Sequence, residues 1–101
     1  MQIEHIERDG ILNVKFMGQI AGTEDANFTN EVNKILKNEC TKVQLDLTHV
    51  SAMNSFAIGK LVGLQKSLTQ NRRVMVIAGI HDNLYRTFYS IHLDKLIKIK
   101  K

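Results

Sequence analysis

Between residues 43 and 68 the pattern of apolar and polar positions changes from that of a strand to that of a helix. Val43, Leu45 and Leu47 alternate with polar residues, which predicts a strand with one buried face. After a short polar turn, apolar positions recur at helical spacing, which predicts a helix up to about residue 68. The positions on its predicted face are Ile58, Leu61, Val62, Gln65 and Leu68. The rest of the fold is predicted around this strand, turn and helix.

Before this unit the sequence predicts an antiparallel hairpin and one helix. Segments 2–7 and 11–17 show strand-like alternation, and Asp9-Gly10 between them is a typical hairpin turn. Thr23 is the expected N-cap of a helix that stops near Asn38. The apolar positions assigned to one face of that helix are Phe28, Val32, Ile35 and Leu36.

After the unit, the pattern predicts a buried strand, a third helix and a short closing segment at 93–99. The run 74–78 is almost continuously apolar, which is typical of a central strand buried on both faces. Segment 81–83 is expected to open the helix. Its apolar positions are Leu84, Tyr85 and Phe88. Strands that alternate with helices favour parallel neighbours, so the predicted fold class is α/β: a mixed, mostly parallel sheet with an N-terminal antiparallel hairpin and helices packed on it.

The composition indicates a small globular protein. With 101 residues, 44% of them hydrophobic, the chain is long enough for one domain over 1–101 with a substantial core. Its one cysteine, Cys40, cannot form an internal disulfide and is more simply a helix-end thiol than a nucleophile. No apolar run approaches the roughly 20 residues of a membrane span, and the N-terminus lacks the apolar core of a signal peptide. We therefore expect a cytoplasmic protein without a membrane partner.

Charge is distributed unevenly along the chain, whose formal net charge is +4. Residues 1–50 carry five Lys or Arg against eight Asp or Glu, and residues 51–101 carry nine against two. Such asymmetry can steer an acidic partner, but it also occurs on solvated surfaces without one. Arg72, Arg73 and the lysines after residue 94 come with no aromatic platform and no nucleic-acid-binding motif. A basic anion- or nucleic-acid-binding domain is therefore a minor alternative.

Nothing in the sequence indicates a catalytic, metal or cofactor site. The four histidines are scattered, without the close pairing that a metal-binding helix needs. Ser55 and His49 lack a third orienting group and a nucleophile-elbow motif, so we do not expect an enzyme. Asp46 is expected to bond to nearby loop amides. Gly59 and Gly63 are expected to allow close packing of their helix on the sheet.

The central unit and the end of the chain resemble a known family. Residues 45–50, Leu-Asp-Leu-Thr-His-Val, are followed by Met-Asn-Ser at 53–55 and a Leu-containing helix. This combination resembles the STAS domain, named for sulfate transporters and anti-sigma factor antagonists. Segment 74–77 is similar to the family's next strand, and 91–96 is similar to its common ending. Because the resemblance covers the whole chain, we expect a stand-alone domain.

The resemblance implies a regulatory binding protein. Stand-alone members bind an anti-sigma factor, a serine kinase with a histidine-kinase-like ATP domain, and phosphorylation of a serine in the loop motif ends that binding. That serine corresponds to Ser55, which is therefore the predicted phosphorylation site. The predicted partner-binding residues are Asn54, Ser55, Phe56, Ala57 and Ile58. The sequence also leaves open whether two copies of the chain form a homodimer.

The loop departs from the family pattern, Asp-Ser-Ser-Gly, at three positions. Asn54 can still cap the helix but brings no charge, and Phe56 sets a bulky apolar group beside the hydroxyl. Ala57 favours helix over the backbone freedom of glycine. A constitutive STAS-type binding module without a working phosphosite is thus the alternative within the same class. Phe56 and Ile58 either form an exposed contact patch or belong to the core.

Overall fold

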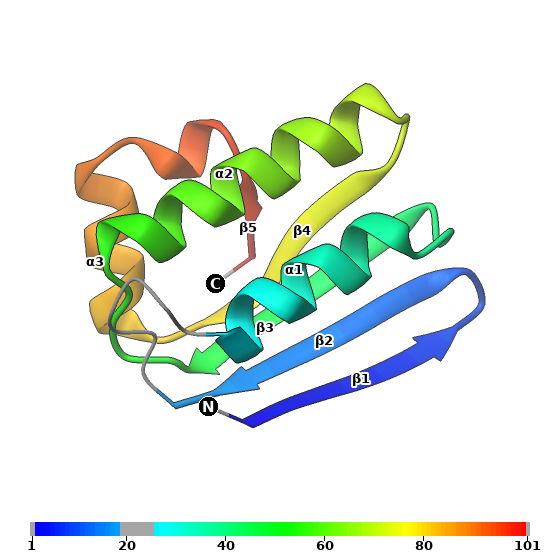
Figure 1. The fold of residues 1–101 in the computed structure, drawn as a ribbon. Helices are drawn as coiled ribbons and strands as arrows, with labels where there is room; N and C mark the ends of the chain where they lie inside the picture. The colour runs from blue at the N-terminus through cyan, green and yellow to red at the C-terminus, as the bar shows by residue number, and fades with distance from the viewer. Residues whose placement is uncertain (1, 19–25, 101) are drawn as a thin grey trace.

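The computed structural model describes residues 2–18 and 26–100, which follow the predicted order of elements (Figure 1). The strands are β1 Gln2–Arg8, β2 Ile11–Met17, β3 Lys42–His49, β4 Val74–Ile80 and β5 Lys98–Ile99. The helices are α1 Ala26–Lys37, α2 Ser55–Gln70 and α3 Asp82–Ser90, followed by the 3-10 helix η1 Leu93–Lys95. The predicted N-cap Thr23 lies outside the described residues.

The described strands form one mixed sheet in the order β1-β2-β3-β4-β5. β1 and β2 are antiparallel, and the turn residues Asp9 and Gly10 have the positive φ angles, 52° and 76°, that a two-residue hairpin turn needs. The later pairs are parallel, which confirms the predicted mixed sheet. Because strand order follows chain order and parallel crossovers are right-handed, the helices between the strands fall on one face. Figure 1 shows α1 and α2 side by side on that face.

The hydrophobic core lies between this face and the helices. Alternate residues of β2 and β3 point into it, and Phe16 packs on Phe28 of α1 with ring centroids 5.8 Å apart. The buried stripe of α2 is Ala57, Leu61, Leu64 and Leu68. The other predicted positions on α2 flank this stripe and are only half-buried. In α1 the prediction for Leu36 is wrong, because its side chain is 39% exposed at the edge of the apolar face.

The opposite face of the sheet is open over the described residues, and β4 shows the consequence. Val74 is 54% exposed and Ala78 is exposed, so the predicted burial of 74–78 on both faces is wrong at the two ends of the run. Val76 is buried on the open face, where it lies in register with Gln44 and Lys98. Its burial is explained by these long neighbouring side chains rather than by a second layer of helices.

A β-bulge near the end of β4 changes which residues face the open side. Leu45 of β3 pairs with Ile77, but the next residue, Asp46, pairs with Gly79. Ala78 is therefore left without a partner in β3. Beyond the bulge the alternation is reversed, and Gly79 lies beside Asp46 on the open face.

Space for a side chain is restricted at Gly79 but not at the two glycines of α2. A Cβ on Gly79 would lie 2.6 Å from Thr48 Oγ1 and 3.1 Å from Asp46 Oδ1. Gly59 and Gly63 are exposed, and a Cβ on either would meet nothing within 4 Å. The prediction that these two glycines bring α2 close to the sheet is therefore wrong. They lie on the solvent side of the helix.

Candidate functional site

Helix α2 begins at Ser55, directly after the N-cap residue Asn54. The backbone of Asn54 is extended, with φ −83° and ψ 171°. Its Oδ1 accepts the Ala57 N–H at 2.9 Å, and its carbonyl oxygen accepts the Ile58 N–H at 3.0 Å. Asparagine caps a helix about as well as aspartate does. Asn54 therefore supplies the cap that the resemblance predicts from aspartate at this position, and lacks only its charge.

The turn that carries Ser55 is anchored in the core on both sides. Val50 and Met53 bury their side chains before the helix, and the Val50 N–H donates to the Leu47 carbonyl at 3.1 Å. Within the helix, Ala57 and Leu61 are fully buried. Packing on both sides thus fixes the backbone position of Ser55.

The predicted partner-binding residues divide between surface and core. Ser55 is exposed, and the Phe56 side chain is 38% exposed. Lys60 Nζ lies 5.4 Å from the centroid of the Phe56 ring, within the range of a cation–π interaction. Asn54 and Ile58 are half-buried, and Ala57 is buried in the core. We call Asn54, Ser55, Phe56 and Lys60 the α2-start surface.

Lys60 is not among the residues predicted for this surface, although its spacing of four from Phe56 is a signal that could have identified it. Residues four apart on a helix are neighbours, so a lysine one turn after an exposed aromatic residue can extend over it. The first turn of α2 carries no acidic residue. Helix dipole and lysine therefore both favour negative charge at this end of the helix.

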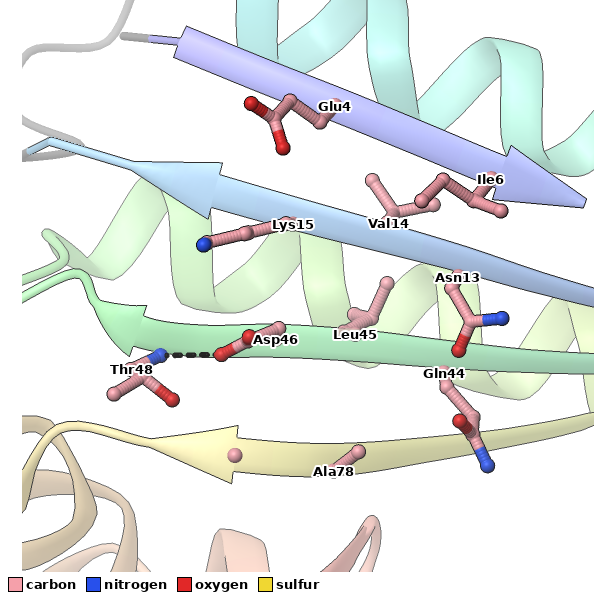
Figure 2. Close-up of a pocket in the computed structure, with 11 residues that line it drawn as sticks. Glu4, Ile6, Asn13, Val14, Lys15, Gln44, Leu45, Asp46, Thr48 and Ala78 are labelled. Carbon is pink, nitrogen blue, oxygen red and sulfur yellow. Dashed lines mark hydrogen bonds between the residues drawn. The ribbon is translucent and has the colours of Figure 1, made fainter.

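A second candidate region, a shallow cavity of about 330 Å³, lies on the open face of the sheet (Figure 2). Its polar lining residues are Glu4, Asn13, Lys15, Gln44, Asp46 and Thr48. Figure 2 shows the hydrogen bond from the Thr48 N–H to Asp46, whose donor and acceptor are 2.9 Å apart. Asp46 is thus a hydrogen-bond acceptor as predicted, but the donor Thr48 belongs to β3 itself, so the prediction of a loop amide as its partner is wrong. The cavity was not predicted, because polar residues alternating along a strand also describe an ordinary solvated face.

The carboxylate of Asp46 is held in its ionised form. Burial by itself would raise its pKa, but hydrogen bonds from the Thr48 hydroxyl and N–H act in the opposite direction. The nearby charges of Lys15 and His49 also lower it, so the pKa of Asp46 is below its ordinary value. Asp46 thus accepts hydrogen bonds and does not supply a proton near neutral pH.

The Cys40 thiol is held by a carboxylate beneath the hairpin. Its Sγ donates to Glu7 Oε1 at 2.6 Å, and its side chain is buried. This hydrogen bond, burial and the charge of Glu7 raise the pKa of Cys40, and Arg73 opposes them. A thiol with a raised pKa is a poor nucleophile.

Within the described part of the chain, the other titratable groups do not form a metal site. His5 Nε2 lies 2.9 Å from Glu31 Oε1, which links β1 to α1. Over residues 2–18 and 26–100, no three His, Cys, Asp or Glu side chains gather as a metal ion would require. In the same residues no helix is long and apolar enough to cross a membrane.

Comparison with known proteins identifies the family. The family model of the STAS domain matches residues 2–101. This chain belongs to the STAS domain family. An anti-sigma-B factor antagonist of Listeria monocytogenes is 36% identical to this STAS domain over 85 residues, which cover 80% of this chain and 75% of that protein.

Solved structures show the same fold. An anti-sigma factor antagonist from Mycobacterium paratuberculosis matches with a TM-score of 0.84 at 15% identity, covering 97% of this chain and 83% of that one. The phosphorylated form of the Bacillus cell fate determinant SpoIIAA matches with a TM-score of 0.70 at 12% identity, covering 99% and 90%. These likenesses confirm the predicted STAS-like α/β fold.

Proposed function

We propose that this STAS domain is an anti-sigma factor antagonist that binds its anti-sigma factor through the α2-start surface and is switched off by phosphorylation of Ser55. The observation that carries the proposal is the exposed Ser55 hydroxyl, which stands at the first position of a helix anchored in the core. A curated relative named as an anti-sigma-B factor antagonist supports the binding role. The function is regulatory binding rather than catalysis.

The fold tolerates a phosphate at this position. A phosphoserine carries about −1.5 to −2 charges at pH 7. At the start of α2 it meets the positive end of the helix dipole, without an acidic residue in the first turn to repel it. Lys60, one turn along the helix, adds a further favourable charge. Modification of Ser55 should therefore change the surface and leave the fold in place.

Binding would respond in the opposite way. A partner fitted to a neutral hydroxyl beside the exposed Phe56 ring must desolvate a dianion once Ser55 is phosphorylated. Burial of an uncompensated charge costs several kcal/mol, which lowers affinity by orders of magnitude. The same charge that the helix dipole stabilises in the free protein thus prevents the complex.

A constitutive binding module is the second candidate, and one observation favours it. The Phe56 ring is 38% exposed directly beside Ser55, where it restricts access of a kinase to the hydroxyl. In that case Phe56 is an anchor of the interface and Ser55 is never modified. Phe56→Ala would then weaken binding strongly, and phosphoserine would not be found in protein isolated from the source cells.

The test is binding of Ser55 variants to the anti-sigma factor, captured from the source cells and purified. Ser55→Asp should keep a melting temperature near that of the parent and lose at least a hundredfold in affinity by calorimetry. Ser55→Ala should bind like the parent and take up no phosphate from the kinase partner. Equal affinity of Ser55→Asp and the parent for this partner would refute the switch.

Two acidic substitutions serve as controls. Asn83→Asp places the same charge in the first turn of α3, where Asn83 is exposed. Ser51→Asp places it in the turn before α2, outside the α2-start surface. Both should retain binding if the effect belongs to Ser55 rather than to net charge. Loss of binding in all three variants would instead indicate general electrostatic repulsion of the partner.

A further inference from the structure

Strand β1 is the outermost strand of the sheet and presents an unusually accessible edge. Figure 1 shows β1 at the edge of the sheet. Every residue of β1 except Ile3 is exposed, and Ile6 is 53% exposed. Among the described residues no element pairs with its outer side. An open strand edge is a template for pairing with another strand, and proteins usually protect it with charged side chains.

The charges of β1 are arranged so that one antiparallel register matches the strand to itself. Residues paired across antiparallel strands share a face, so only registers that keep the two faces apart are compatible with the sheet. When Ile6 stands opposite the Ile6 of a second copy, Glu4 stands opposite Arg8, and the symmetry repeats this pair. On the other face, His5 then stands opposite Glu7. On the open face the pairs are thus apolar with apolar and acid with base. On the helix-covered face His5 and Glu7 already contact Glu31 and Cys40, so the Glu4–Arg8 pairs carry the charge match.

Neighbouring registers lack this match. If the register is shifted by two residues in one direction, His5 stands opposite the His5 of the second copy, and Glu4 stands opposite Ile6. Shifted in the other direction, Glu7 faces Glu7. Opposite charges directly across a strand pair stabilise it and like charges destabilise it. Charged side chains on an edge strand usually prevent pairing, but the order of residues 4–8 favours pairing in one particular register.

We propose that β1 pairs antiparallel with β1 of a second copy of this chain, about a two-fold axis at Ile6. The pairing joins two sheets into one and covers the exposed Ile6. The axis leaves the α2-start surface accessible, because β2 and β3 separate β1 from β4, against which α2 packs. The inference is independent of the proposed function. With residues 4–8 as the paired segment, the interface is smaller than the roughly 1,600 Å² of a standard complex, so the association is weak.

Charge reversal in trans tests both the dimer and its register. In sedimentation equilibrium at low ionic strength, up to about 1 mM protein, the parent should self-associate. Glu4→Arg and Arg8→Glu should each weaken self-association roughly tenfold or more, since each places two like-charged pairs across the axis. An equimolar mixture of the two variants should associate again, because both arginines of one chain then face glutamates of the other.

A charge added to β1 outside the paired segment serves as the control. Gln2→Arg adds a positive charge to the same face of β1 outside the paired segment and should associate like the parent. Circular dichroism melting confirms that each variant is folded, as expected for exposed sites. A parent chain that stays monomeric at about 1 mM overturns the proposal. So does a mixture that fails to associate, or a Gln2→Arg variant that alone disrupts the dimer, because that result belongs to a different register.

Discussion

The two faces of β3 differ sharply in burial and polarity. Val43, Leu45 and Leu47 have no exposed surface and form the centre of the core. Between them, Gln44 and Asp46 reach the open face and line the cavity beside Lys15 (Figure 2). One strand thus supplies a packed apolar surface on one side and a polar surface with a single held carboxylate on the other.

This difference shows where the candidate site obtains its geometry. The α2-start surface belongs to the covered side, because Ala57 and Leu61 are buried in the first and second turns of the helix that Ser55 begins. Close packing leaves these residues little freedom. The open face depends instead on hydrogen bonds to Asp46 and on the absence of a side chain at Gly79. Substitutions on the two faces should therefore have effects of different size and kind.

The largest effect is expected for Leu61→Ala on the covered face. Leu61 is fully buried between α2 and the sheet. Its truncation removes apolar contacts and leaves a cavity, which should cost about 2–5 kcal/mol of the free energy of unfolding. Urea denaturation measures this cost, and Lys66→Ala on the exposed side of the same helix should change stability by less than about 0.5 kcal/mol. Equal costs for the two variants would mean that α2 is not packed as described.

A smaller effect is expected for Gly79→Ala on the open face. The new Cβ would lie 2.6 Å from Thr48 Oγ1, so the Thr48 side chain must rotate and release its contact with Asp46. Overpacking of this kind costs roughly 1–3 kcal/mol. In a Thr48→Ala background the same substitution should cost much less, and a double-mutant cycle measures that coupling. Additive costs would show that Thr48 is not what excludes a side chain at 79.

Gly63→Ala is the matched glycine control and should have the opposite sign. Gly63 lies in the interior of α2, and a Cβ there meets nothing within 4 Å. Alanine is favoured over glycine inside a helix by about 1 kcal/mol, so thermal denaturation should show a modest stabilisation. A destabilised Gly63→Ala would indicate that this side of α2 is packed against something after all.

The covered face was predictable because burial leaves a period in the sequence. Alternation at Val43, Leu45 and Leu47 gave β3, and the helical spacing of Leu61 and Leu68 gave α2. The predictions of burial were wrong where a residue lies at the end of a strand or at the margin of a helix face, because the hydrophobic period does not reveal such a place. Val74 is apolar but lies at the open end of β4, and Leu36 lies at the margin of α1. Both are apolar residues within apolar patterns, so their sequence context looks the same as that of a buried residue.

The candidate site was predictable in position but not in composition. The capping residue Asn54 and the exposed Ser55 follow from turn chemistry at the start of a helix. The burial of Ala57 and the approach of Lys60 to Phe56 depend on how the helix is rotated on the sheet. The cavity near Asp46 depends on the bulge that brings Gly79 beside it, and a bulge leaves no period to detect.

The smallest effect on stability is expected for Asp46→Asn. The pH dependence of the free energy of unfolding distinguishes this effect from that of a simple hydrogen-bond loss. The folded pKa of Asp46 lies below its ordinary value, so the carboxylate contributes stability that is complete above the unfolded pKa, about 3.9 for a free aspartate. That contribution is lost as pH falls through the folded pKa. Asp46→Asn should thus cost under about 1 kcal/mol at pH 7, and the difference from the parent should shrink on acidification.

Urea denaturation at neutral and acidic pH measures this difference. Glu39→Gln removes an exposed carboxylate and corrects for the change in net charge that both variants share. If the cost of Asp46→Asn instead grows as pH falls, burial outweighs the Thr48 hydrogen bonds and the pKa of Asp46 is raised. The open face would then carry a desolvated carboxyl group rather than a hydrogen-bonded carboxylate. Burial, rather than hydrogen bonding, would then dominate the energetics of both faces of β3.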